Sequence, residues 1–158
     1  LREDGEKSDL CEDSEVENIV ITGSVQEAVE YLRHTQGNIL IATGSKELHL
    51  YTVIEGYEKR CFARVLSTRD AVEESVRLGF KGRNLIAMQG PFSAEMNVAL
   101  LHQTKAKYFV TKESGKAGGF EEKKKAARET GAVLVVVGRP AEEGETLADV
   151  IRMTEHFE

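Results

Sequence analysis

Short apolar runs alternate with longer segments of helical periodicity along most of this chain. Each run holds aliphatic and β-branched residues and is bounded by turn-forming residues, a pattern that predicts a β-strand. The runs at 38–43 and 133–137 are almost uninterrupted, which indicates strands buried on both faces of a sheet. The predicted strands cover residues 18–22, 38–43, 61–66, 85–88, 108–111 and 133–137.

Helices are predicted between these strands from their caps and their apolar periodicity. Ser24 and Glu27 have the spacing of a capping box, and Gly37 is predicted to close the helix that they begin. Thr68 is predicted to cap the next long helix, with Asp70 near its N-terminal dipole. The predicted helices follow Ser24, Thr68 and Ser93 and cover residues 48–52, 120–130 and 146–156.

The helix after Ser93 is expected to turn Met96, Ala99 and Leu100 towards the core. Because strands alternate with helices throughout, the predicted fold class is α/β with a mostly parallel sheet. Residues 1–17 have no regular apolar period and many acidic side chains, so we expect a charged linker or arm. The remaining residues suit one domain with a full core.

Composition and charge narrow the class of partners. The 158 residues are 41% apolar and 30% charged, as in ordinary globular proteins. The net charge of −6 argues against nucleic acid and membrane surfaces as partners. No apolar run approaches the roughly 20 residues of a membrane span, and we expect no secretory signal. Cys11 and Cys61 lack metal-ligand spacing and favour reduced thiols over a disulfide, so we expect a cytoplasmic protein without a metal site.

Three polar, glycine-rich loops each follow a predicted strand and open a helical segment. In an open α/β sheet, loops after parallel strands emerge at one edge, where helix N-termini favour anions. The sequence therefore predicts a crevice for a negatively charged ligand. The loops are 43–46, 89–93 and 111–119.

The first loop is Thr43-Gly44-Ser45-Lys46. Gly44 permits a close approach of the backbone, and the two hydroxyl groups can donate hydrogen bonds to phosphate or carboxylate. A tight turn followed by a helix cap explains the same residues, so both interpretations stay open.

The second loop is Gln89-Gly90-Pro91-Phe92-Ser93. Gln89 offers an amide at a strand end, and the Gly-Pro pair predicts a sharp turn. Phe92 is an apolar residue in a loop, where it can cover a flat ligand. The alternative is that Phe92 folds back as a hydrophobic staple beside the helix capped by Ser93.

The third loop begins with Thr111 and Lys112 and includes Ser114 and Gly115. Further on, Gly118 and Gly119 demand special backbone geometry or a close approach, and the lysine can meet an anion. A solvated loop with surface lysines is the alternative. The spacing matches neither the Rossmann dinucleotide fingerprint nor a Walker A loop.

Arg64 interrupts an otherwise apolar strand. It can pair with a ligand carboxylate, or the strand can be an edge strand with Arg64 exposed to solvent. No residue has the surroundings of an activated nucleophile or proton donor.

Together, these segments resemble the precorrin-6A reductase family, whose members act on precorrin-6A or cobalt-precorrin-6A. The resemblance runs from about Val16 to Pro140 and covers the second half of the family's sequence. Glu113 and Lys116 depart from it, since family members usually have Asp and often Gly there. It is carried by Ile41–Lys46, Phe62–Leu66, Ile86–Ser93 and Val110–Gly119 and extends to Gly138-Arg139-Pro140.

The resemblance implies a Rossmann-like three-layer sandwich, residues 18–158, on the substrate side of a two-domain reductase. It implies hydride transfer from NADPH or NADH to a tetrapyrrole, giving the 6B form in cobalamin biosynthesis. Family members begin with a dinucleotide-binding loop that this chain lacks, so we expect that the cofactor-binding domain is absent and that the chain alone is inactive. The expected substrate-binding residues are those of the three loops and Arg64.

Two other classes of function are consistent with the loops. A non-catalytic α/β domain that binds a phosphosugar would also place Thr-Gly-Ser at a strand end. A structural domain would use the loops to bind a partner subunit. The ligand distinguishes these classes, because a phosphosugar needs neither an aromatic cover nor three loops.

Overall fold

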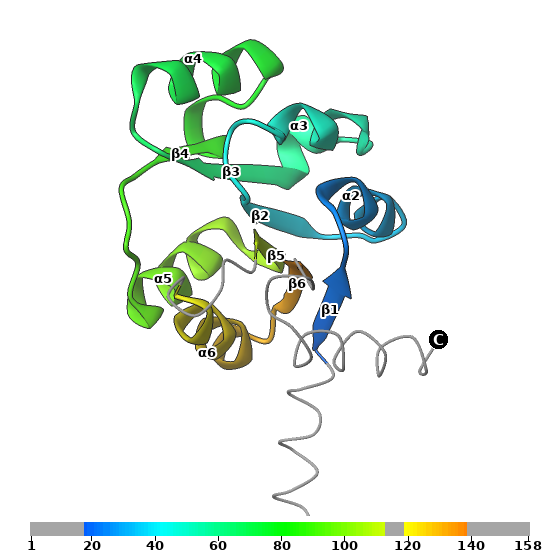
Figure 1. Cartoon of the computed structure of the whole chain (residues 1–158), viewed down its shortest axis with the longest axis vertical. Helices are drawn as coiled ribbons and strands as arrows, with labels where there is room; N and C mark the ends of the chain where they lie inside the picture. Colours follow the sequence, from blue (N-terminus) through cyan, green and yellow to red (C-terminus); the bar gives the residue numbers. More distant parts are fainter. Residues whose placement is uncertain (1–17, 113–118, 139–158) are drawn as a thin grey trace, which may run out of the picture.

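A parallel sheet runs through the middle of the computed structural model, which describes residues 18–112 and 119–138 (Figure 1). The described strands form one sheet in the order β1-β6-β5-β2-β3-β4, and each neighbouring pair is parallel. The predicted α/β class is therefore confirmed. The strands are β1 (Ile19–Thr22), β2 (Asn38–Ala42), β3 (Cys61–Val65), β4 (Leu85–Ala87), β5 (Ala106–Lys112) and β6 (Val133–Val137).

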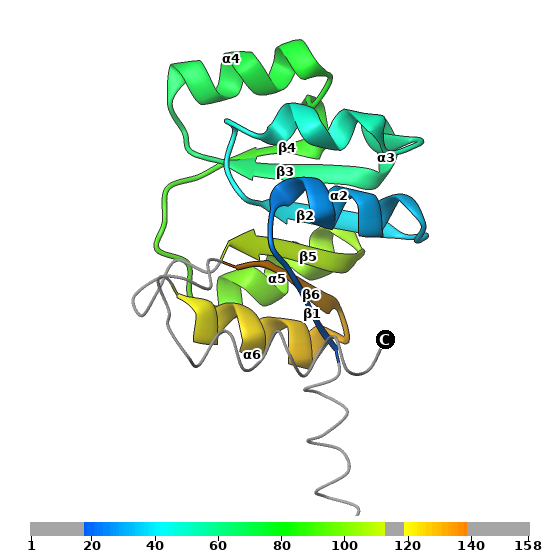
Figure 2. The ribbon, with the colours of Figure 1, turned by 45° about the vertical axis from the view of Figure 1, so that its right-hand side comes forward.

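Helices cover both faces of the sheet, so the domain has the expected three layers (Figure 2). One face carries α2, α3, α4 and the 3-10 helix η1, and the other face carries α5 and α6. The helices are α2 (Val25–Arg33), η1 (Leu48–Val53), α3 (Tyr57–Arg60), α4 (Arg69–Leu78), η2 (Gly82–Asn84), α5 (Ala94–Thr104) and α6 (Phe120–Thr130).

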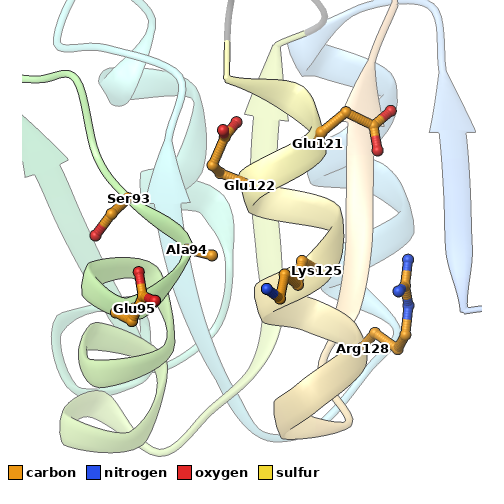
Figure 3. A pocket seen from close by; sticks show the side chains of 7 residues that line it. All are labelled: Ser93, Ala94, Glu95, Glu121, Glu122, Lys125 and Arg128. Carbon is orange, nitrogen blue, oxygen red and sulfur yellow. The ribbon is translucent and has the colours of Figure 1, made fainter.

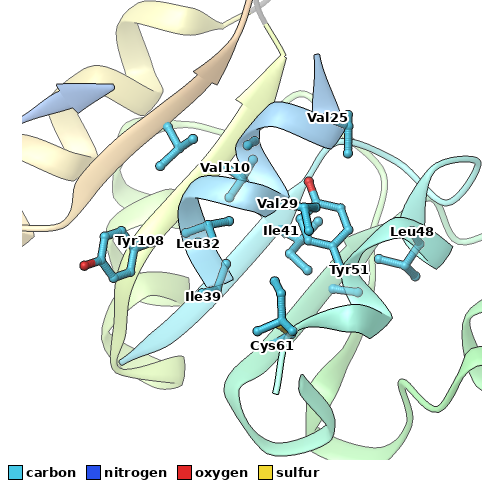
Figure 4. Close-up of a cluster of buried hydrophobic side chains, with 14 of the residues drawn as sticks. Val25, Val29, Leu32, Ile39, Ile41, Leu48, Tyr51, Cys61, Tyr108 and Val110 are labelled. Atoms are coloured by element: carbon cyan, nitrogen blue, oxygen red, sulfur yellow. The ribbon is translucent and has the colours of Figure 1, made fainter. Parts of the chain in front are cut away.

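The first face holds the larger apolar cluster (Figure 4). Leu32 of α2, Ile39 of β2 and Tyr51 of η1 are completely buried there, as is Phe80 after α4. Burying a side chain of this size contributes about 1.5–3 kcal/mol to folding. The second face is smaller and uses alanines in α6, which bring that helix close to β6.

The predicted helix caps are confirmed. The Ser24 hydroxyl accepts a hydrogen bond from the backbone N–H of Glu27 at 3.1 Å, and the Glu27 carboxylate accepts one from Gly23 at 2.7 Å. Thr68 and Ser93 cap α4 and α5 in the same way, through the N–H three positions on. These caps satisfy N–H groups that a helix start leaves without partners.

The inward face of α5 differs from the sequence prediction. Met96 and Ala99 are exposed and Leu100 is half-buried, so two of the three expected core positions were wrong. The helix is rotated so that a polar residue, Asn97, is completely buried. The buried positions of α5 are Asn97, Leu101 and Thr104, which repeat at helical spacing.

The end of α2 also differs from the prediction. The helix ends at Arg33, and Gly37 does not close it. Gly37 instead has a φ of 112° in the turn that leads into β2. The expected arm at 1–17, Cys11 and the expected helix at 146–156 lie outside the described residues.

Candidate functional site

The strand order places the chain reversal between β2 and β5. From β2 the chain proceeds to β3 and β4 on one side, and then returns to β5 and β6 on the other. Ligands of open α/β sheets bind at the carboxyl ends of strands at such a switch point. The first and third predicted loops follow these two adjacent strands, whereas the second loop follows β4, with β3 between it and β2.

The loop after β2 combines a buried hydroxyl with an open turn. Thr43 is buried, and its Oγ1 lies 2.9 Å from the hydroxyl of Tyr51. Burial raises the pKa of Tyr51, so this phenol stays neutral. Gly44 has a φ of 92° with open space where a Cβ would stand. Ser45 is half-buried and Lys46 is exposed, so these two residues can meet a ligand.

An ion pair joins the two loops at the switch point. Lys112 Nζ, at the end of β5, lies 2.9 Å from Glu47 Oε1, and both side chains are about half exposed. The carboxylate oxygen is enclosed but makes no hydrogen bond of good geometry. Lys112 therefore already has a negative partner, which the sequence did not predict. Next to it, buried Thr111 accepts a hydrogen bond from Lys123 Nζ at 2.8 Å.

The third loop is described only at its ends. Ser114, Gly115 and Gly118 lie outside the described residues. Gly119 has a φ of 74° and immediately precedes α6, as its predicted special geometry requires.

The loop after β4 is tethered to the end of β3. The Gln89 side-chain oxygen accepts hydrogen bonds from the N–H and the hydroxyl of Ser67 at 3.2 and 3.1 Å. The Gly90–Pro91 bond is cis, and Ser93 caps α5. Gln89 thus holds the loop in place instead of projecting freely.

Arg64 lies in an interior strand and is only 5% exposed, so the exposed-edge alternative was wrong. Its Nη1 donates a 2.7 Å hydrogen bond to Asn97 Oδ1 in α5. The ring of Phe92 stacks on the guanidinium with 3.8 Å to its centroid, and Phe109 lies at 5.6 Å. Phe92 therefore covers Arg64. Burial lowers the pKa of Arg64 to about 10, which still leaves it charged at neutral pH.

Asn97 is the polar residue of this site that sequence reasoning missed. It is completely buried, and its Nδ2 has no hydrogen-bond partner among the described residues. The available signal was its position four residues before Leu101, which places this polar side chain on the same face of the helix as Leu101. An amide in that place needs a buried partner, and Arg64 is that partner.

A separate open groove lies between the start of α5 and the length of α6 from Glu121 to Arg128 (Figure 3). Its volume is about 420 Å³, and of the predicted site residues in the described ranges only Ser93 lines it. Three glutamates and two basic residues line it, so both signs of charge are present. The lining residues are Ser93, Ala94, Glu95, Glu121, Glu122, Lys125 and Arg128.

Within residues 18–112 and 119–138, no three His, Cys, Asp or Glu side chains are grouped to hold a metal. No helix of these ranges is long and apolar enough to cross a membrane. Cys61 is a free, buried thiol.

The sheet order first identifies the structural class of the domain. The sheet order with a switch point between β2 and β5 is that of a Rossmann-like domain, and the polar loops at this point are suited to an anionic ligand. A solved structure of CobK precorrin-6A reductase has the same fold, with a TM-score of 0.59 and 19% identity. The match covers 77% of this chain and 47% of that one.

The sequence comparisons narrow the class. The family described as precorrin-6x reductase CbiJ/CobK matches residues 6–156, so the chain belongs to this family. It is 37% identical over 126 residues to the cobalt-precorrin-6A reductase of Priestia megaterium, covering 78% of this chain and 49% of the relative. The Salmonella typhimurium enzyme of the same name is 36% identical over 117 residues, covering 74% and 44%. The chain thus spans about half the length of the curated relatives it matches.

The described loops do not fit a dinucleotide cofactor. A Rossmann cradle needs a tight glycine turn and an α-helix N-terminus beside the pyrophosphate. Here the segment after β2 leads into a 3-10 helix, and Gly44 faces open space. The Glu47 carboxylate also lies at this edge, where it pairs with Lys112.

Proposed function

We propose that this chain supplies the substrate-binding part of a reductase in cobalamin biosynthesis. The whole protein would convert precorrin-6A or cobalt-precorrin-6A to the 6B form with NADPH or NADH. Family membership supports this proposal, as do the names of the relatives. The observation that carries the substrate-binding role is the switch point itself, where the ion pair of Lys112 with Glu47 joins the carboxyl ends of the adjacent strands β2 and β5.

The tetrapyrrole is a large, flat molecule with several carboxylate side chains. Lys46 and Lys112 bind carboxylates at the crevice, and Ser45 and the backbone around Gly44 add hydrogen-bond donors. The loop after β4, which lies beyond β3, extends this surface on one side. Holding a substrate at several points fixes its orientation, which is the main contribution that such a domain makes to a reaction.

The nicotinamide supplies the hydride and is bound by residues outside the described part of this chain. In this proposal residues 18–158 belong to the substrate-side domain, and residues 1–17 are a charged linker or arm. The chain alone binds tetrapyrrole but does not reduce it. We place the protein in the cytoplasm, where biosynthetic reductases meet reduced nicotinamide cofactors.

The test is a fluorescence titration of the 158-residue chain with uroporphyrin, a stable tetrapyrrole with carboxylate side chains. We expect saturable binding that weakens as salt rises. Lys112→Ala is expected to weaken binding about fivefold, since a half-exposed charge contributes about 1 kcal/mol. Lys81→Ala is the matched control, because Lys81 is exposed at the opposite edge of the sheet.

Two results would contradict the proposal. Absence of saturable binding to the wild-type chain would overturn the substrate-binding role. Equal affinity of Lys112→Ala and Lys81→Ala would remove Lys112 from the site.

A phosphosugar is the alternative ligand, favoured by the open space at Gly44 beside a serine hydroxyl. Glucosamine 6-phosphate added to the same titration separates the two functions. It displaces uroporphyrin at micromolar concentration only if the crevice is a phosphosugar site.

A further inference from the structure

Arg64 is a buried cation without a counterion. Its side chain comes from an interior strand and is only 5% exposed, yet no carboxylate of the described residues forms an ion pair with it. Its hydrogen bond goes to Asn97, a neutral amide. A buried charge is normally paired, because removing it from water is costly. The unpaired charge therefore needs an explanation.

Asn97, which accepts the hydrogen bond from Arg64, itself has a donor without a hydrogen-bond partner among the described residues. Its Oδ1 accepts from Arg64, whereas its Nδ2 is enclosed and donates to nothing in the described ranges. Both atoms belong to one amide, so the idle donor is on the same side chain that accepts from Arg64. The Arg64–Asn97 pair thus keeps a donor that no acceptor of the described residues reaches.

Phe92 determines the direction from which an acceptor can approach. Its ring stacks on the face of the guanidinium, at 3.8 Å. Stacking leaves the N–H groups free, because they lie in the guanidinium plane. The enclosed side-chain atoms without a hydrogen bond are Asn97 Nδ2 and Glu47 Oε1, and no nitrogen of Arg64 is among them. The remaining guanidinium nitrogens thus keep contact with solvent along the edge of the group.

We propose that Arg64 and Asn97 form a socket that binds one carboxylate side chain of the ligand, with Phe92 as its outer wall. The inference rests on the proposed function, because it takes the ligand to be a tetrapyrrole carboxylate. The charge fits this group: one guanidinium and one neutral amide balance a single negative charge. A phosphate dianion would keep one negative charge uncompensated in a buried place.

The socket would fix the orientation in which the substrate binds. Arg64 lies in β3, and the switch point lies beside it, between β2 and β5. One carboxylate held in the socket and others held at Lys112 would fix the macrocycle in a single orientation. The socket therefore selects a tetrapyrrole whose carboxylates have the matching spacing.

The first test places a carboxylate of the protein itself next to Arg64. Asn97→Asp keeps the shape of the side chain and occupies the socket from within. We expect about tenfold weaker binding of uroporphyrin and an unfolding midpoint at or above that of the wild type. Gln103→Glu adds the same charge on an exposed position of α5 and is expected to stay within twofold of the wild type.

The second test follows the socket without a tetrapyrrole. The Nε–Hε resonance of Arg64 is observed by NMR while sodium propionate replaces sodium chloride at constant ionic strength. We expect a saturable shift in the wild type and none in Asn97→Asp. A larger shift with phosphate than with propionate would overturn the assignment to a single carboxylate.

The outcomes separate the socket from the function on which it rests. If uroporphyrin binds and Asn97→Asp keeps wild-type affinity, the socket is wrong and the proposed function stands. If uroporphyrin fails to bind while propionate still shifts Arg64, the socket stands and the proposed function fails. If propionate leaves the Arg64 resonance unmoved, the socket is overturned.

Discussion

The two faces of the sheet bury ionisable groups in opposite ways. On the face covered by α2 and η1, Tyr51 and Cys61 are buried in their neutral forms. The Tyr51 hydroxyl has a partner in Thr43. On the face covered by α5, Arg64 is buried as a cation, and the amide that holds it keeps an unused donor.

This difference indicates different purposes. A core built for stability satisfies its polar groups, as the pairing of Thr43 with Tyr51 does on the first face. Groups that stay unsatisfied lower stability and persist where binding needs them. The ligand site therefore lowers the stability of the second face, whereas the first face contains most of the apolar core. Measurements of stability can test this division.

The first face is expected to set an alkaline limit to the stability of the domain. Burial raises the pKa of Cys61 from about 9 to about 12, so the folded state keeps a proton that the unfolded state loses. The stability that the protonated Cys61 gives to the folded state is fully present below pH 9 and is lost as the pH rises from 9 through 12. The loss amounts to about 2 kcal/mol by pH 10.5, at 1.36 kcal/mol per pH unit.

Cys61→Ala is expected to lose about 1 kcal/mol at pH 8 and to depend less on pH above 9. Denaturant unfolding between pH 8 and 10.5 measures how the unfolding free energies of the variant and of the wild type change with pH. Parallel curves for the variant and the wild type would contradict the role of the thiol. Arg64 opposes the trend above pH 10, since its lowered pKa makes the folded state lose its proton first.

A pair of substitutions compares the two faces directly. Asn97→Ala leaves the Arg64 guanidinium buried without a hydrogen bond, which is expected to cost about 3 kcal/mol. Thr43→Val removes the partner of a neutral phenol and is expected to cost about 1 kcal/mol. Urea denaturation at pH 7 gives both values. The comparison fails if the threonine variant is the less stable of the two.

The smallest effect on stability is expected at the crevice itself. Glu47→Gln removes the negative partner of Lys112, and the half-exposed pair is expected to change the unfolding free energy by less than about 1 kcal/mol. Affinity for uroporphyrin is expected to rise about fivefold, because the lysine no longer has an internal competitor. Glu55→Gln, exposed after η1, is the control. Unchanged or weaker binding would show that Glu47 does not compete with the ligand.

Much of the fold was predictable because its signals are local. Strand positions follow from apolar runs, and the caps at Ser24, Thr68 and Ser93 depend on a few neighbouring residues. The orientation of α5 was not predictable in this way. Its exposed residues include Met96 and its buried ones include Asn97, because a partner 33 positions away in β3 determines the rotation.

The site was predictable as an edge of the sheet but not as a set of contacts. The loops after β2 and β5 were expected to meet, and the strand order brings them side by side. The sequence offered no means to see that Glu47 pairs with Lys112, since the two are far apart along the chain. Nor could it place Phe92 on Arg64 instead of on a ligand. Both contacts depend on long-range packing.

The pairing of β1 with β6 has a consequence for how the chain folds. The first described strand bonds to the last, with Ile19 opposite Leu134. During synthesis, β1 therefore lacks its partner in the described sheet until almost all of that sheet has been made. The interior pairs of β2 with β3 and β5 close shorter loops and are available earlier. We thus expect β1 to be the last strand to join the sheet and, in a native-state exchange experiment, among the first to release its amides.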